Sequence, residues 1–119
     1  MTATISTHVL NGVDGSHCGG IEVTLSRLNS DGSRETWFTQ STGADGRLVR
    51  EIELSWADPQ TVYEMTFRTG PYWAERELPR DGPQLVSEIV IRVQMQDPDK
   101  RYHIPIIISP NSYSVWWSS

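Results

Sequence analysis

The chain has 119 residues, a formal net charge of −5 and a sequence pI of about 5.0. This length suits one domain with its own core, so we expect a single domain over residues 1–119. The acidic balance argues against nucleic acid as a partner, because phosphate binding needs a basic face.

Cysteine usage and the N-terminus indicate the compartment. Cys18 is the single cysteine, which excludes an intrachain disulfide and fits a reducing environment. The first ten residues lack the basic start and apolar core of a signal peptide. No window approaches the ~20 apolar residues of a membrane span. We therefore expect a cytoplasmic protein that contacts no membrane.

Alternation of apolar and polar residues, many of them β-branched, dominates the chain and predicts strands. In chain order the predicted strands cover residues 3–10, 21–28, 34–40, 48–54, 61–68, 85–95, 101–109 and 112–117. The apolar phase changes inside the second of them, after Leu25. A single short helix is predicted over residues 70–79, with a proline near each end. About eight short strands and one short helix predict an all-β, two-sheet β-sandwich.

The segment "IPIIIS", residues 104–109, is an apolar run with little alternation. Such a run is typical of a strand that is buried on both faces or that lies at an interface. We therefore expect an oligomer.

Three histidines and one arginine are the candidate reactive side chains. His17 lies in a glycine-rich loop, where we expect it to be solvated and inert. His8 and His103 lie inside predicted strands, where each alone favours a structural role. Arg47 follows the turn "GADG", an ordinary surface position. No HxH or CxxC spacing predicts a metal site, and no phosphate-binding loop or nucleophile elbow is present.

Four segments, in order, resemble the transthyretin-like family, and within it the 5-hydroxyisourate hydrolases of purine catabolism. The opening "ISTHVLNGVDGSHCGGIEVTLSRL" is similar to the family pattern "LSTHVLD…G.PA.G…V.L…L". "TGADGRL" resembles "T…ADGR", and "YEMTFRTGPYWA" resembles "Y.L.F.T..Y". "YHIPIIISPNSYS" is similar to "YH.P.L.SP..YS". The resemblance runs from end to end and implies a transthyretin-like sandwich.

The resemblance also implies an activity and an assembly. Members of this kind form homotetramers, dimers of dimers, with ligand grooves at the subunit interface. The histidine of "STHVL", the arginine of "ADGR" and the histidine of "YH.P" fall on His8, Arg47 and His103. These three are the expected catalytic residues for cofactor-free and metal-free hydrolysis of a cyclic amide in a small heterocyclic substrate. A histidine can take a proton from water near pH 7, and arginine can stabilise the developing oxyanion.

The C-terminal tail departs from the family. The hydrolases typically end in "YRGS", whereas this chain ends in "WWSS". Trp116, Trp117, Ser118 and Ser119 take the four places. Exchange of arginine for Trp117 removes a cation and adds a flat apolar surface. We expect Trp116, Trp117 and Ser119 to bind substrate, or the tryptophans to pack on a neighbouring subunit.

Three functions stay open on the sequence. The first is hydrolysis of 5-hydroxyisourate to 2-oxo-4-hydroxy-4-carboxy-5-ureidoimidazoline in urate catabolism. The second is hydrolysis of another cyclic amide or spirocyclic heterocycle, which the altered tail favours. The third is a non-catalytic ligand carrier like transthyretin, against which the retained His8, Arg47 and His103 argue.

Overall fold

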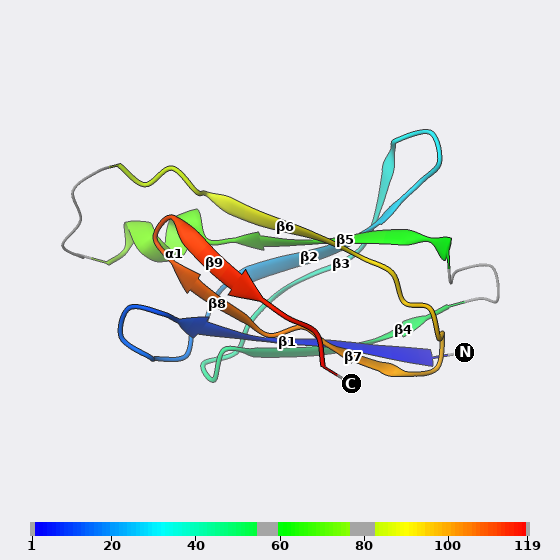
Figure 1. Ribbon diagram of the computed structural model, residues 1–119, viewed down its shortest axis with the longest axis horizontal. Coiled ribbons are helices and arrows are strands. Elements are labelled where there is room, and N and C mark those ends of the chain that lie inside the picture. The colour runs from blue at the N-terminus through cyan, green and yellow to red at the C-terminus, as the bar shows by residue number, and fades with distance from the viewer. Residues whose placement is uncertain (1, 55–59, 77–82, 119) are drawn as a thin grey trace.

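The computed structural model describes residues 2–54, 60–76 and 83–118, in which nine strands form two sheets and are joined by one short helix (Figure 1). The elements are β1 (Thr2–Asn11), β2 (Glu22–Leu28), β3 (Arg34–Ser41), β4 (Arg47–Glu53), β5 (Val62–Arg68), α1 (Gly70–Ala74), β6 (Glu88–Val93), β7 (Arg101–His103), β8 (Ile106–Ser109) and β9 (Ser112–Val115). The helix is too short to cross a membrane, and the described part of the chain has no other candidate.

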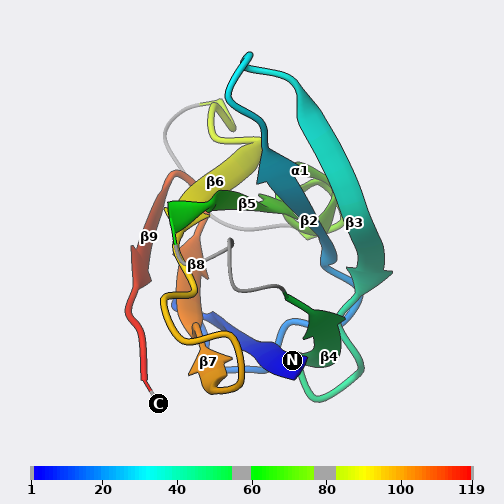
Figure 2. The ribbon, with the colours of Figure 1, turned by 90° about the vertical axis from the view of Figure 1, so that its right-hand side faces the viewer.

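The two sheets pack face to face (Figure 2). One has the strand order β4-β1-β8-β9, with β7 also paired to β1; the other has the order β3-β2-β5-β6. Strand pairs are antiparallel except for those that β1 makes with β7 and β8, which are parallel. The prediction of an all-β, two-sheet sandwich with one short helix is confirmed.

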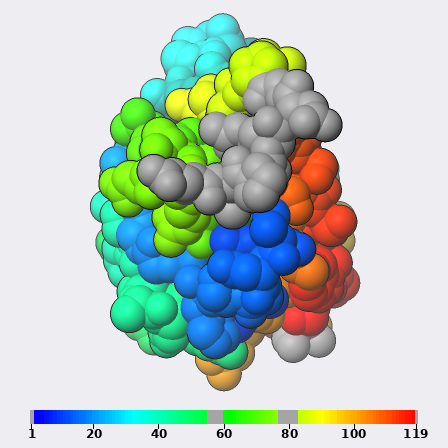
Figure 3. Space-filling model, turned by 90° about the vertical axis from the view of Figure 1, so that its left-hand side faces the viewer, coloured from blue at the N-terminus to red at the C-terminus, as the bar shows by residue number. Residues whose placement is uncertain are grey.

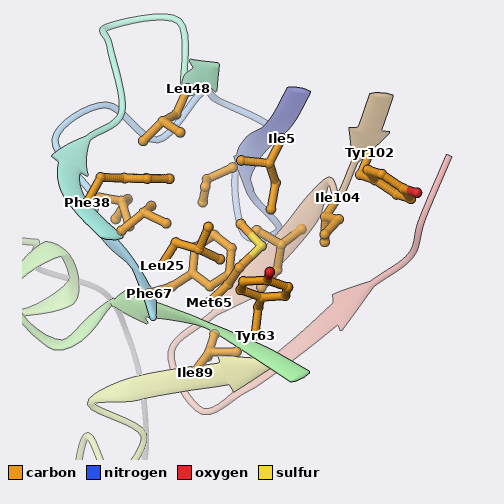
Figure 4. Close-up of a cluster of buried hydrophobic side chains, with 14 of the residues drawn as sticks. Ile5, Leu25, Phe38, Leu48, Tyr63, Met65, Phe67, Ile89, Tyr102 and Ile104 are labelled. Carbon is orange, nitrogen blue, oxygen red and sulfur yellow. The ribbon is translucent and has the colours of Figure 1, made fainter. Parts of the chain in front are cut away.

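Buried side chains from both sheets form the core between them (Figure 4). Ile5 of β1 and Leu48 of β4 meet Leu25 of β2 and Phe67 of β5 in this cluster. Alternation along β1 decides which side chains stay outside. Because Ile5 and its neighbours at every second position are buried, Ser6 and His8 lie on the outer face of the sheet.

The predicted strand over residues 101–109 is two strands in the structure. Ile104 still donates its backbone N–H to the Ser6 carbonyl at 2.8 Å, but Pro105 has no N–H to continue the ladder. β1 therefore pairs first with β7 and then with β8. In β8, Ile106 and Ile108 are buried whereas Ile107 is half-buried, so the run is fully buried on one face only. The alternative expectation, that this run lies at a subunit interface, stays a prediction.

Other element boundaries also differ from the predictions. The helix ends at Ala74, and residues 77–79 of the predicted helix lie outside the described residues. The sixth strand begins at Glu88 and the last ends at Val115, so the two tryptophans follow the sheet. The predicted phase change in β2 corresponds to a register shift between Leu25 and Ser26.

Candidate active site on the outer face of the sheet

Strand register brings the three expected catalytic residues to one face. His8 of β1 lies directly opposite Arg47 of β4, and Ser6 lies opposite His103 of β7. Residues opposite one another in a ladder point to the same side, as do residues two apart on one strand. His8, Arg47 and His103 therefore share the outer face of the β4-β1-β7 sheet, away from the core.

Gly46 sets the position of Arg47. Its backbone has a φ of +75°, and a Cβ added there would lie 2.5 Å from the Val9 carbonyl oxygen and 3.3 Å from a His8 ring carbon. Glycine alone among the amino acids allows both this conformation and this approach. Val9 donates its N–H to the Gly46 carbonyl at 2.8 Å, which joins the turn to β1. The "ADGR" turn thus places Arg47 across from His8.

His103 is held by the neighbouring strand and by the tail. Its Nδ1 lies 2.8 Å from the Ser6 hydroxyl oxygen. Its backbone N–H donates to the Ser118 carbonyl at 3.0 Å, and the Ser118 N–H donates to the His103 carbonyl at 2.8 Å. The C-terminal tail therefore runs alongside the site. Ser119 lies outside the described residues, so its expected binding role stays a prediction.

The sequence reasoning missed the contact between His17 and His8. Nε2 of His8 lies 2.9 Å from Nδ1 of His17, and the two rings stack with centroids 5.1 Å apart. His17 is exposed, as expected, but it is not isolated from the site. Its loop lies at the end of the molecule beside the turn before β4 (blue and teal in Figure 3). Distance along the chain gives no signal of this contact, because it depends on how the loop folds back along β1.

Burial and charge act on both strand histidines in the same direction. Burial, followed by the positive charge of Arg47, lowers the pKa of His103 below its ordinary value of 6.5. The pKa of His8 is lowered by burial first, then by Arg47 and His17, while the Asp45 carbonyl and carboxylate oppose the shift. Both rings are therefore mostly neutral at pH 7, the form that can accept a proton.

The Arg47 guanidinium is available to a ligand. It is exposed, and within residues 2–54, 60–76 and 83–118 no side chain binds it. Its fixed, planar donors suit a carbonyl oxygen or carboxylate. In the same ranges no three His, Cys, Asp or Glu side chains lie together in a way that could hold a metal ion.

Trp116 and Trp117 line a different part of the surface from the three polar residues. Trp116 and Trp117 are 46% and 63% exposed and border a hollow of about 500 Å³ between the tail and the end of β6. Its other lining residues are Ile91, Val93, Gln94, Met95, Gln96, Asp97, Lys100, Tyr102, Ile104 and Val115. His8, Arg47 and His103 do not border this hollow. The structure thus places His8, Arg47 and His103 on one face and the two tryptophans on a neighbouring surface. Ser118, which follows Trp117 and bonds to His103, links the two surfaces.

Comparison with known proteins gives consistent matches over the whole chain. A family model described as "HIUase/Transthyretin family" matches residues 5–117. The 5-hydroxyisourate hydrolase of Halalkalibacterium halodurans is 28% identical over 119 residues, which is 100% of both chains. The structure of Klebsiella pneumoniae 5-hydroxyisourate hydrolase has a TM-score of 0.76 and 27% identity, and the match covers 98% of this chain and 99% of that one. A structure of (S)-allantoin synthase has a TM-score of 0.81 and 26% identity; the match covers 99% of this chain but 44% of that one.

Proposed function

The chain belongs to the HIUase/Transthyretin family and is an enzyme of its hydrolase branch, and from this premise we propose that it hydrolyses 5-hydroxyisourate to 2-oxo-4-hydroxy-4-carboxy-5-ureidoimidazoline in urate catabolism. One observation carries the proposal: His8, Arg47 and His103 share the outer face of one sheet. A neutral base and a free cation beside each other are what hydrolysis of an amide-like bond needs.

In this proposal His103 is the general base. Its Nδ1 faces the Ser6 oxygen at 2.8 Å, and a proton on Nδ1 that is donated to Ser6 leaves the Nε2 lone pair free. The lowered pKa of His103 keeps that lone pair available at pH 7. Nε2 takes a proton from a water molecule while the water oxygen bonds to the carbonyl carbon of the ring.

Arg47 and His8 complete the reaction. As the water oxygen bonds, the carbonyl oxygen gains negative charge, which the Arg47 donors stabilise. When the C–N bond breaks, its electron pair goes to nitrogen, which takes the proton that His103 accepted. One water is consumed, the carbonyl becomes a carboxyl group and the nitrogen an N–H. His8, opposite Arg47, orients the ligand by packing its ring against it.

The assembly and location belong to the same proposal. We expect a homotetramer, a dimer of dimers, in which the outer sheet face of one subunit meets that of another and the groove between them holds the substrate. The exposed Arg47 and the half-buried Ile107, both on this sheet, support the presence of a covering partner. We expect the enzyme to work in the cytoplasm. Light scattering at micromolar concentration tests the assembly, and a monomer would contradict the shared groove.

The Trp pair supports a second candidate substrate. Trp116 and Trp117 expose a large flat apolar surface next to the segment that binds His103. A cyclic amide or spirocyclic heterocycle with an aromatic or apolar part could stack there while its amide meets His103. The same catalytic residues would then open a ring other than 5-hydroxyisourate.

Direct turnover separates the two substrates. Urate and urate oxidase generate 5-hydroxyisourate in the cuvette, and its decay is followed in the ultraviolet with and without the enzyme. Decay well above the spontaneous rate, with the ring-opened product identified by carbon NMR, supports the first candidate. Decay at the spontaneous rate would contradict it and leave the second, which is then tested with aryl-substituted cyclic amides.

A further inference from the structure

A second imidazole contacts His8 from outside the set of three residues on which the proposed function rests. Nε2 of His8 and Nδ1 of His17 lie 2.9 Å apart, and the rings are inclined by only 16°. We propose that His17 is a positioning residue that fixes the orientation and the proton arrangement of the His8 ring. The effect of this pair on turnover rests on the proposed function, whereas the coupling of the two rings does not.

The backbone places His17 beside His8. Asn11 donates its N–H to the Ser16 carbonyl at 2.8 Å, and Cys18 donates to the Val9 carbonyl at 2.9 Å. These bonds set His17 opposite Leu10 in an antiparallel bridge. His8 and Leu10 are two apart on β1 and share its outer face. The His17 ring is therefore carried to His8 by a hydrogen-bonded segment rather than by a free loop.

Side-chain hydrogen bonds within the loop restrict its conformation. The Asp14 carboxylate accepts hydrogen bonds from both the backbone N–H and the hydroxyl of Ser16, at 2.9 and 2.6 Å. The Asn11 side-chain oxygen accepts from the N–H of Val13 at 2.8 Å. Such bonds are typical of tight Asx turns and restrict the segment that leads to His17.

The hydrogen bond between the rings limits the number of protons that the two histidines can carry. One nitrogen must donate and the other accept, so the bond holds a single proton between Nε2 of His8 and Nδ1 of His17. A second charge would put a donor on both sides and break the bond. While the bond lasts, the pair carries at most one positive charge. Because the Asp45 carbonyl accepts from the His8 ring, its proton lies on Nδ1, and Nε2 accepts from His17. The bond from His17 therefore reinforces this tautomer of His8 and opposes protonation of its Nε2.

Two other charged groups act on His8 in the described residues. Arg47 of β4 adds a positive charge on one side, and Asp45 in the preceding turn acts in the opposite direction. Both come from the "ADGR" turn and remain in any His17 variant.

Two variants distinguish an effect of the His17 imidazole from an effect of the loop conformation. His17→Ala removes the ring, whereas His17→Asn keeps a polar atom near the position of Nδ1 but cannot titrate. The His8 ring is titrated by proton–nitrogen NMR in the wild type and in each variant, which gives its pKa and its tautomer. In parallel, kcat and KM for 5-hydroxyisourate are measured across pH 5 to 8.

The expected results differ between the variants. In His17→Ala the His8 pKa rises toward its ordinary value, the Nε2–H tautomer of His8 gains population, and kcat at pH 7 falls about tenfold with KM nearly unchanged. His17→Asn keeps one tautomer and recovers most of kcat. An unchanged His8 pKa and tautomer in His17→Ala would overturn the proposal, even if kcat fell through a loop defect. If no variant and not even the wild type turned over 5-hydroxyisourate, the proposed function would fail, and the NMR titration would still decide the role of His17.

Discussion

The Ser6 hydroxyl lies 2.8 Å from Nδ1 of His103, across the parallel pairing of β1 with β7. This contact joins two residues 97 positions apart in the chain and fixes which ring nitrogen of His103 faces outward. A base at Nε2 needs its other nitrogen protonated, and the Ser6 oxygen can accept that proton. The catalytic role proposed for His103 therefore depends on Ser6.

Ser6→Ala should lower kcat by about five- to tenfold, because one hydrogen bond of about 1 kcal/mol no longer favours the active tautomer. KM should change little, since the proposed role of Ser6 is to orient His103 and not to bind the ligand. Steady-state kinetics at pH 7 measures both values. Ser30→Ala, at an exposed serine in the turn between β2 and β3 on the other sheet, serves as the matched control and should keep wild-type kcat. Equal kcat in the two variants would contradict the role of Ser6.

Activity should fall on the acid side with a midpoint below 6.5, because the pKa of His103 is lowered by burial and by Arg47. A lowered pKa means that the neutral, active form persists to lower pH and is lost only when pH falls through that value. Arg47→Gln removes the charge but leaves the burial. Its His103 pKa, measured by NMR, should therefore rise part of the way toward 6.5, and an unchanged value would show that the charge does not reach the ring.

Gly46→Ala should destabilise the fold far more than Gly15→Ala. Gly46 and Gly15 have positive φ angles, +75° and +77°. Each alanine therefore loses about 1–2 kcal/mol of stability, because a side chain disfavours the left-handed backbone conformation. At Gly15 the new Cβ has open space, whereas at Gly46 it would lie 2.5 Å from the Val9 carbonyl oxygen. We expect a total loss of about 3 kcal/mol or more for Gly46→Ala. Urea unfolding measures the difference, and equal losses would contradict the close approach of the turn to β1.

Trp117→Ala should raise KM several-fold with kcat nearly unchanged if the tail contacts the substrate, because uniform binding is lost. The same reasoning applies to Trp116→Ala. Tyr113→Ala is the control: this side chain of β9 is 47% exposed but does not border the hollow. Equal KM in the tryptophan variants and in the control would place the tryptophans away from the substrate.

The architecture was predictable because strand patterns are local. Alternation in residues 3–10 and 61–68 is enough to predict two half-buried strands, and a short segment with a proline near each end is enough to predict a short helix. The break at Pro105 was less clear, since a proline can also end an edge strand. Exact strand ends depend on pairing with partners that the pattern does not name.

The site was predictable only through family resemblance. Spacing alone does not reveal that His8 and Arg47 face one another, because the register of β1 against β4 depends on the Gly46 turn. The His17 contact was missed for the same reason. Glu64 shows the same limit, because nothing in its spacing indicates that it is buried and binds Arg34 and Arg92 across the second sheet.

Turnover of freshly generated 5-hydroxyisourate by the wild type and by His103→Asn tests the central claim most directly. Asparagine keeps a group that can bond to Ser6 but has no Nε2, so the variant should fold normally and lose the base. We predict wild-type decay far above the spontaneous rate and a loss of about 10²-fold or more in kcat for His103→Asn. Equal rates for the two proteins would contradict the assignment of hydrolysis to this face of the sheet.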